Sequence, residues 1–238
     1  MEPFSDESNL DQKWTQLNEE ILGCRKCPRL VAWREEVART RRKAYRDETY
    51  WGKPITGFGD KAGRILVVGL APGAHGANRT GRIFTGDGSG EFLFRALYQA
   101  GFANQPTATS IDDGLCLEDL YISAVCRCVP PGNKPNRDEL ANCLPYLEKE
   151  LAYLTRLQVI VVLGHIAFDQ TLRLYKAQGY DLPRLKFAHG AIHDLGESLP
   201  WLVASYHPSR QNTQTGRLNE AMFAEIWEKA RSLLKAKD

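Results

Sequence analysis

The alternation of short apolar runs with longer amphipathic segments is the feature that most constrains the fold of this chain. The apolar runs cover about residues 64–70, 120–125, 158–163 and 201–206. The first run ends at glycine residues, which is typical of a buried parallel strand. Strands that alternate with helices indicate βαβ units, so the sequence predicts an α/β fold with a mostly parallel sheet and helices on both faces.

Amphipathic periodicity predicts a helix after each of these runs. We expect helices over about residues 88–101, 136–155, 164–179 and 215–235. The first of them is predicted to have Ser89 as its N-cap and Gly101 just beyond its last turn. The second is predicted to be capped by Asn136 or by Arg137 and Asp138.

A chain of 238 residues with 43% hydrophobic and 25% charged residues has the composition of a globular protein. This composition excludes a disordered tail, a collagen and a disulfide-stabilised mini-protein. No linker or internal repeat divides the sequence, so we expect a single domain over residues 1–238. The formal net charge of +2 is too small to indicate a nucleic-acid partner by itself, so any polyanion site must come from local clustering.

The first residues are acidic and polar, without the apolar stretch of a secretory signal. No apolar run approaches the roughly 18–20 residues of a membrane span. We therefore expect a protein of the reducing cytoplasm. Because disulfides are rare in that compartment, the six cysteines are expected to serve a metal site, a cluster or the core.

Four of the cysteines have a spacing that suits a thiolate-bound metal centre. Cys24 and Cys27 form a C-x2-C pair in an N-terminal helical segment of about residues 10–46. Cys128 and Cys143 are separated by a stretch that runs from a strand end into a helix. Thiolates bind both Zn²⁺ and iron–sulfur clusters, and the spacing alone does not choose between them.

The neighbours of these cysteines strengthen the expectation of a metal centre. Arg25, Lys26 and Arg29 favour the thiolate form of the nearby sulfurs, and the split arrangement of the four cysteines leans towards a cluster. The other two cysteines, Cys116 and Cys126, are expected to be core residues.

Three loops of unusual composition follow predicted strands, at residues 69–73, 126–131 and 207–209. The carboxyl ends of parallel strands share one edge of the sheet, and ligands bind at that edge in open α/β folds. The sequence therefore predicts that these loops converge on one site.

The loop after the first strand, residues 69–87, is rich in glycine and leads into a helix. A phosphate cradle would suit that arrangement, but the loop matches neither of the usual nucleotide-binding glycine motifs. Phe84 is predicted to be exposed there and to offer a flat face to a base. Asp87 stands at the helix start, where backbone amides stabilise its carboxylate; its simplest interpretation is an N-cap.

Three ordered segments together resemble the motifs of the uracil-DNA glycosylase superfamily. They read GLAPGAHGANRTGRIFTGD from residue 69, CVPPGNKP from residue 128 and HPSRQNTQTGRL from residue 207. The likeness is greatest to family 5, the type-B iron–sulfur enzymes of bacteria and archaea, and it covers nearly the whole chain from Cys24 onward. The resemblance implies a three-layer α/β/α sandwich around a four-stranded, mainly parallel sheet.

The resemblance implies a monofunctional uracil-DNA glycosylase that leaves an abasic site, with a 4Fe–4S cluster as its cofactor. The ligands it implies for that cluster are Cys24, Cys27, Cys128 and Cys143. The partner it implies is DNA that contains deaminated bases, and we expect the chain to act as a monomer.

Three polar residues have catalytic roles by the same resemblance. Asp87 is expected to stabilise an oxocarbenium-like sugar or to orient the attacking water. His207 is expected to donate a hydrogen bond to the leaving base without needing a charge. Asn133 is expected to position the water or to touch the base.

The base-binding residues implied are Phe84, which would stack on the flipped base, and Leu70 and Ala71, whose backbone amides would contact its carbonyl groups. Family 4 members usually carry an acidic residue in place of Leu70 and a uracil-reading asparagine in place of Ala124. Ala124 cannot make those paired hydrogen bonds, so the pocket should discriminate by shape and stacking. We therefore expect a broad range of substrates that includes hypoxanthine as well as uracil.

Contacts to DNA are expected from the last motif and from basic residues of the other two. These residues are Ser209, Arg210, Arg217, Lys134, Arg79 and Arg82. Arg210 is the candidate to enter the gap left by the flipped base. The stretch 34–46 carries six basic residues against Glu35 and Glu36; it either binds DNA or forms a solvated helix face.

Three other functions remain as alternatives at this point. The main one is a non-catalytic iron–sulfur or zinc protein that binds a DNA lesion without releasing the base, which Asp87 and His207 argue against. The second is a narrow family 4 uracil enzyme, which Leu70 and Ala124 disfavour. The third is a zinc nuclease, for which the histidines and carboxylates show no ligand spacing.

Overall fold

A six-stranded sheet forms the centre of the computed structural model, which describes residues 4–235. The strand order is β1-β3-β2-β4-β6-β5. The strands are β1 (Phe58–Gly59), β2 (Ile65–Gly69), β3 (Leu120–Ala124), β4 (Val159–Leu163), β5 (Ile192–His193) and β6 (Trp201–Ser205).

The four central strands run parallel, and their register is continuous from β3 through β2 and β4 to β6. All four were predicted from the apolar runs, so the α/β class is confirmed. The prediction of a four-stranded sheet was incomplete, because β1 and β5 add antiparallel edges to it. Each edge strand has only two residues, too few for a hydrophobic period to show in the sequence.

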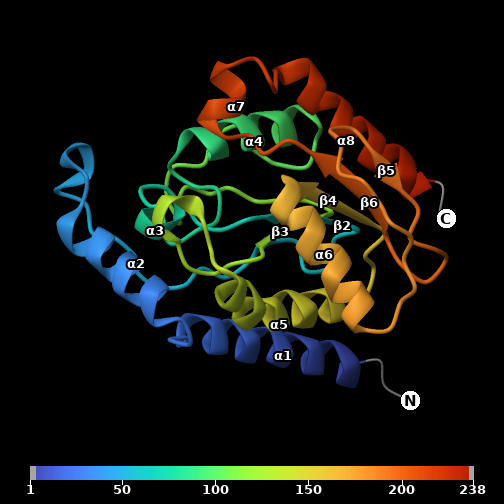
Figure 1. Cartoon of the computed structure of the whole chain (residues 1–238), viewed down its shortest axis with the longest axis horizontal. Helices are drawn as coiled ribbons and strands as arrows, with labels where there is room; N and C mark the ends of the chain where they lie inside the picture. Colours follow the sequence, from blue (N-terminus) through green and yellow to red (C-terminus); the bar gives the residue numbers. More distant parts are fainter. Residues whose placement is uncertain (1–3, 236–238) are drawn as a thin grey trace.

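Helices cover both faces of this sheet (Figure 1). The longer ones are α1 (Phe4–Leu22), α2 (Pro28–Thr40), α4 (Gly88–Gln99), α5 (Arg137–Tyr153), α6 (His165–Ala177) and α8 (Glu220–Lys235). Shorter ones are α3 (Ala77–Thr80), α7 (Arg210–Gln214) and the 3-10 turns η1 (Lys43–Tyr45) and η2 (Pro131–Asn133). None of the helices within residues 4–235 is long and apolar enough to cross a membrane.

The alternation of side chains along β2 divides the core into two layers. Ile65 and Val67 face the layer that α4 and α8 cover. Leu66 and Val68 face the layer of α1, α5 and α6, where Trp14 is fully buried. Because both faces of the central strands are covered, their sequences are continuously apolar rather than alternating.

Two helix starts differ from those predicted. The N-cap of α4 is Asp87 rather than Ser89, because the Asp87 carboxylate accepts hydrogen bonds from the backbone of Ser89 and Gly90. The last long helix begins at Glu220 and not near residue 215, since the separate helix α7 precedes it. The prediction of Asn136 as the cap of α5 is confirmed, and its side chain forms a capping box with Glu139.

Candidate active site

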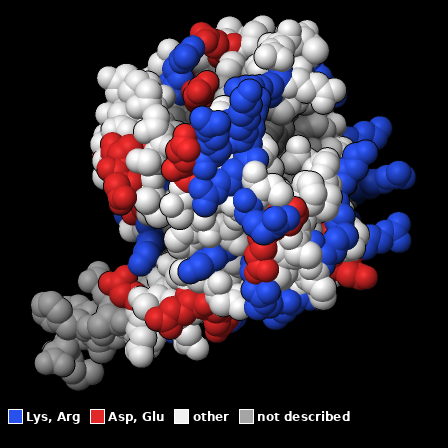
Figure 2. Space-filling view, turned by 90° about the vertical axis from the view of Figure 1, so that its left-hand side faces the viewer, with Lys and Arg blue, Asp and Glu red and all other residues white. Residues whose placement is uncertain are grey.

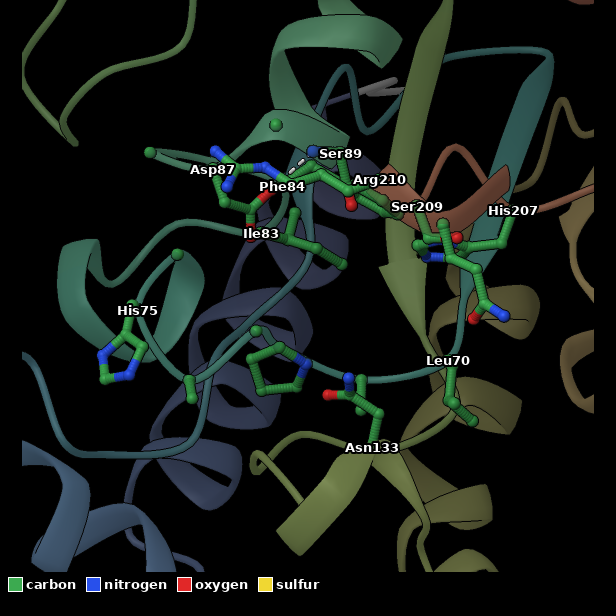
Figure 3. Close-up of a pocket in the computed structure, with 18 of the residues that line it drawn as sticks. Leu70, His75, Ile83, Phe84, Asp87, Ser89, Asn133, His207, Ser209 and Arg210 are labelled. Carbon is green, nitrogen blue, oxygen red and sulfur yellow. Dashed lines mark hydrogen bonds between the residues drawn. The ribbon is translucent and has the colours of Figure 1, made fainter. Parts of the chain in front are cut away.

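A cavity of about 630 Å³ opens at the carboxyl ends of the parallel strands (Figure 3). Its walls come from the loop after β2, the η2 turn that follows β3, and the segment after β6. The loops after β2 and β6 meet at the cavity as predicted, whereas residues 126–131 do not line it and the segment after β3 reaches it through Asn133. Of the residues predicted for the site, Leu70, Ala71, Phe84, Asp87, Asn133, His207, Ser209 and Arg210 line this cavity.

The Asp87 carboxylate is held at the rim of the cavity by the start of α4. Its Oδ1 accepts hydrogen bonds from the backbone N–H groups of Ser89 and Gly90, both at 3.0 Å. Its Oδ2 lies so close to Gly76 that a Cβ at that position would be 2.0 Å away. Only a residue without a side chain fits there, so the glycine-rich loop is a cradle for this carboxylate.

The charge state of Asp87 reflects opposing effects. Burial raises the pKa of the carboxyl group above its ordinary value, while the amides of Gly90 and Ser89 and the charge of Arg210 lower it. Asp87 is therefore both the N-cap that the simplest interpretation predicted and a member of the cavity wall. Its Oδ2 accepts no hydrogen bond from residues 4–235, which leaves that atom for a ligand.

Phe84 and His207 form an aromatic pair in the cavity. Their rings are stacked with centroids 5.8 Å apart and an interplanar angle of 29°. Phe84 is only 9% exposed, so the prediction of an exposed ring was wrong; its backbone has φ +52°. A Cβ on Gly69 would be 3.0 Å from this ring, so the last residue of β2 makes room for it.

His207 is a neutral imidazole at this site. Burial lowers the pKa of its ring to about 4, and its backbone carbonyl accepts a hydrogen bond of 2.8 Å from the Asn212 side chain. A neutral ring offers one N–H donor. His207 can therefore donate a hydrogen bond into the cavity at neutral pH without carrying a charge.

The four cysteines predicted as ligands lie near enough to one another to interact electrostatically. Cys27 and Cys128 are buried together around Leu30. Burial raises the pKa of both thiols, and the charges of Cys143 and Cys24 raise them further. All are free thiols. Within residues 4–235, no three His, Cys, Asp or Glu side chains converge closely enough to hold a single metal ion.

Hydrogen-bond donors surround these sulfurs. The Asn142 side chain lies 3.6 Å from Cys27 Sγ, and an Arg34 nitrogen lies 2.9 Å from Cys128 Sγ. Hydrogen bonds from the Cys126 thiol and the Arg127 backbone lower the pKa of Cys143 to about 7. Such donors suit anionic sulfur, so the residues present fit a thiolate-bound group.

A comparison with protein-family models identifies the uracil DNA glycosylase superfamily over residues 56–231. That match spans well over half of the chain. The chain belongs to the uracil-DNA glycosylase superfamily.

Curated members of the superfamily resemble the chain over most of its length. A type-5 uracil-DNA glycosylase of Thermus thermophilus is 49% identical over 213 residues, which is 90% of this chain and 94% of the relative. Another from Mycobacterium tuberculosis is 47% identical over 219 residues, 92% of this chain and 81% of the relative. A type-4 enzyme of Pyrobaculum aerophilum is 30% identical over 195 residues, 82% of each chain. Within the superfamily, this chain therefore groups with type 5.

Not every residue that the superfamily motifs pointed to lies in the cavity. Ala124 is fully buried in β3, opposite Gly69, and does not reach the cavity surface. Lys134 and Arg217 lie outside the cavity, and the Arg217 guanidinium sits over the Tyr206 ring at 4.6 Å. Cys116 is exposed, so the prediction that it is a core residue was wrong, whereas Cys126 is fully buried.

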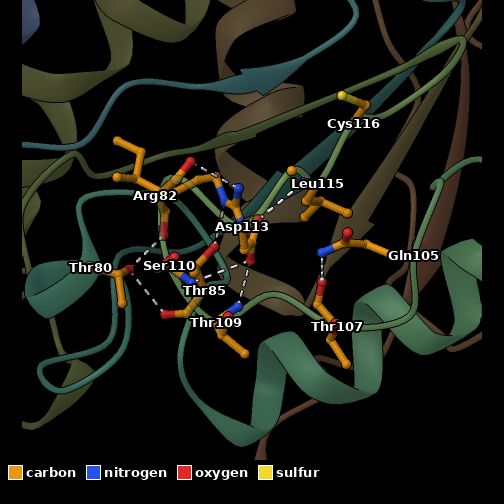
Figure 4. Close-up of polar contacts among 12 residues, drawn as sticks. Thr80, Arg82, Thr85, Gln105, Thr107, Thr109, Ser110, Asp113, Leu115 and Cys116 are labelled. Carbon is orange, nitrogen blue, oxygen red and sulfur yellow. Dashed lines mark hydrogen bonds and ion pairs between the residues drawn. The ribbon is translucent and has the colours of Figure 1, made fainter.

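Two arginines of the first superfamily motif have internal partners instead of facing solvent. Arg79 is 9% exposed and pairs with Glu48, and Arg82 is 4% exposed and pairs with Asp113 at 2.7 Å. Figure 4 shows the Arg82 network, in which the loop around Asp113 is tied to the motif. The prediction that these two arginines contact phosphates is therefore wrong.

The basic stretch 34–46 divides between buried, paired and cavity-lining side chains. Arg34 is buried, Arg39 pairs with Glu36 at 2.7 Å, and Arg42 lines the cavity together with Tyr45 and His75. Sequence reasoning missed Arg42 and Tyr45 as cavity residues, although the excess of basic residues was a signal for them. Basic side chains gather on this side of the molecule with acidic ones among them (Figure 2).

Proposed function

We propose that this protein is a DNA repair glycosylase that flips a deaminated base out of DNA and hydrolyses its N-glycosidic bond. The observation that carries the proposal is one cavity that joins a buried carboxylate, a flat aromatic face and a neutral histidine, from Asp87, Phe84 and His207. Type-5 relatives at 47–49% identity are named uracil-DNA glycosylases. Uracil and hypoxanthine are the proposed substrate bases, and an abasic site is the product.

The flipped base would enter the cavity against the Phe84 ring. Flipping costs a few kcal/mol and costs less for a mispaired base, so the lesion itself supplies part of the selectivity. Backbone amides near Leu70 and Ala71 lie on the cavity wall, where base carbonyl groups can accept their hydrogen bonds. Ala124 offers no polar group and is buried, so recognition depends on shape and stacking rather than on a uracil-specific pair of hydrogen bonds.

Cleavage of the N-glycosidic bond leaves positive charge on the sugar and negative charge on the base, and the cavity holds residues that can stabilise each of these charges. The Asp87 carboxylate stabilises the cationic sugar or orients water, and His207 donates a hydrogen bond to the anionic base. Asn133, whose side chain lies across the cavity from Asp87 in Figure 3, positions the water or contacts the base.

DNA binding involves exposed groups at the cavity mouth. Ser209 and Arg210 line the cavity, and Lys134 and Arg217 are exposed outside it. Because cations that neutralise phosphates release counterions, binding is proposed to fall steeply as salt rises.

The cofactor we propose is a 4Fe–4S cluster held by Cys24, Cys27, Cys128 and Cys143. When bound, the cluster supplies a covalent link between the N-terminal segment and the sheet, and a centre that can change oxidation state. The chain's own residues prepare the site with the donors to Cys27, Cys128 and Cys143 described above. Anaerobically purified protein should contain iron and acid-labile sulfide in equal amounts; zinc without sulfide would contradict this cofactor.

The function is tested by incubating the protein with duplexes that contain uracil, hypoxanthine or no lesion. Alkali then reveals abasic sites as strand breaks. We expect breaks at the lesion only after alkali, which separates a glycosylase from a nuclease and from a protein that only binds. Release of uracil alone would exclude the broad substrate range, and no release from either lesion would exclude the glycosylase.

Replacing His207 by alanine is expected to lower the single-turnover rate of base release about 10²–10³-fold, the usual cost of removing one preorganised donor. In the wild type, the rate should show no inflection near pH 6.5, the ordinary pKa of histidine, because the ring stays neutral down to about pH 4. Rates are measured across about pH 5 to 8. His165→Ala, at an exposed histidine outside the cavity, is the control. An inflection near pH 6.5 that His207→Ala abolishes would contradict the neutral donor.

A further inference from the structure

Arg34 is a buried cation on α2, between the cysteines and the active-site loop. The residue is only 2% exposed. Its Nη1 lies 2.9 Å from Cys128 Sγ, and its Nη1 and Nη2 lie 3.4 and 3.3 Å from the Cys24 carbonyl oxygen. One guanidinium group thus joins the two chain segments that carry the first and third of the proposed ligands.

Among residues 4–235, no carboxylate pairs with Arg34 at less than 4.0 Å. Glu35 is 4.0 Å from it, is about half exposed, and binds Arg25 at 2.6 Å. The Nε of Arg34 has no partner among residues 4–235. A buried cation against a neutral thiol would be unfavourable, whereas a metal-bound sulfur at Cys128 is anionic and supplies the missing negative charge.

The side chain of Arg34 contacts the cysteine segments, whereas its backbone is hydrogen-bonded to the active-site loop. Its carbonyl oxygen accepts a hydrogen bond of 3.3 Å from the side chain of Asn78, which is 1% exposed. The Asn78 backbone N–H donates in turn to the Gly73 carbonyl at 3.0 Å. Gly73 is part of the cradle around Asp87, since a Cβ there would be 2.7 Å from Asp87 Oδ2.

We propose that Arg34 is a positioning residue that couples the cysteine centre to the catalytic loop, through its guanidinium at Cys128 and through Asn78 at the Asp87 cradle. This inference rests on the proposed function and cofactor. The electrostatic part of the coupling comes from the buried charge of Arg34. This charge stabilises the more negative state of the cysteine centre and therefore raises the reduction potential of the centre. The mechanical part of the coupling comes from the hydrogen bonds that connect Arg34 to Gly73 through Asn78.

The test compares Arg34→Gln, Arg34→Lys and Asn78→Ala as intact, cluster-containing proteins. Arg34→Gln should lose iron in air faster than wild type, by about 10–100-fold if the rate follows the loss of affinity usual when a group that supports metal ligands is removed, and should have a lower reduction potential. Arg34→Lys keeps the charge and should restore most of the potential. Asn78→Ala cuts only the link to the loop, so it should retain iron as wild type does but release base more slowly.

Hydrogen–deuterium exchange of residues 73–78 supplies a readout that needs no activity. Both Arg34→Gln and Asn78→Ala should exchange faster there than the wild type, and Arg39→Gln, on the exposed face of the same helix, should match the wild type in every measurement. A wild type that releases no base, together with variants that still show the expected changes in reduction potential and in exchange of residues 73–78, would exclude the proposed glycosylase function and support the coupling. Unchanged potential and iron loss in Arg34→Gln, or unchanged exchange in Asn78→Ala, would overturn the coupling. If Arg34→Gln does not fold, iron loss and exchange in Arg34→Lys and Asn78→Ala decide it.

Discussion

Replacing Asp87 by asparagine is expected to lower the single-turnover rate of base release at least about 10²–10³-fold, because it removes the negative charge that we propose stabilises the developing sugar cation. Asparagine is as good an N-cap as aspartate, so α4 should keep its first turn and the variant should keep the stability of the wild type. The substitution therefore separates the two roles of Asp87, as the cap of α4 and as a wall of the cavity. The measurement is base release from a uracil duplex with enzyme in excess.

The pH dependence of the wild type gives a second view of the same group. Burial raises the pKa of Asp87, so its carboxylate becomes protonated at a higher pH than an exposed aspartate, whose pKa is about 3.9. As the solution is acidified, the rate should therefore begin to fall at a pH higher than about 3.9.

Asp112→Asn, at an exposed loop position, is the matched control for Asp87→Asn. If the rate of Asp87→Asn stayed within about threefold of the wild-type rate, the carboxylate would not be catalytic, because a threefold change is far smaller than the expected loss.

Replacing Arg127 by methionine is expected to destabilise the fold by about 3–5 kcal/mol, the usual cost of removing one partner of a buried ion pair. Arg127 is 1% exposed and Glu150 is fully buried. Glu150 accepts hydrogen bonds from both Arg127 and Ser123 through the same oxygen, while its other oxygen has no partner among residues 4–235. Loss of the arginine leaves a buried carboxylate without its counter-charge. Urea unfolding measures the change in the free energy of unfolding.

A double variant distinguishes charge from packing at this pair. Adding Glu150→Gln to Arg127→Met removes the uncompensated charge and should recover part of the lost stability. Arg95→Met, at an exposed pair with Glu220, should change stability by no more than about 1 kcal/mol. If Arg127→Met alone were as mild as Arg95→Met, the buried pair would not matter for stability. Because Arg127 also precedes Cys128, the same variant is expected to loosen the segment that carries this proposed ligand.

The strands could be predicted from the sequence because their apolar runs record burial on both faces. The cysteine spacing and the three motifs likewise indicated the residues that would meet, since the carboxyl ends of parallel strands share one edge. Leu70 and His207, which follow on strand ends, were therefore correctly placed at the cavity. Membership of the uracil-DNA glycosylase superfamily, predicted from these motifs, is confirmed by the family match over residues 56–231.

The charged residues were harder to assign, because a sequence does not show which partner a charge will meet. Arg79 and Arg82 are in a motif with a DNA-binding character, yet both face carboxylates inside the protein. Arg34 belongs to a stretch that looks like a solvated basic face, and it is buried against Cys128. Arg42, from the same stretch, lines the cavity.

The sequence by itself therefore determined the parallel sheet, the edge at which the site forms and the chemical groups present there. Periodicity and spacing depend only on the order of the residues, so they can be read directly from the sequence. Only the tertiary structure decided the state and neighbours of those groups: the raised pKa of Asp87, the neutral ring of His207 and the link from Arg34 to Asn78. Each of these depends on burial and on contacts between segments distant in sequence, and those arise only when the chain has folded.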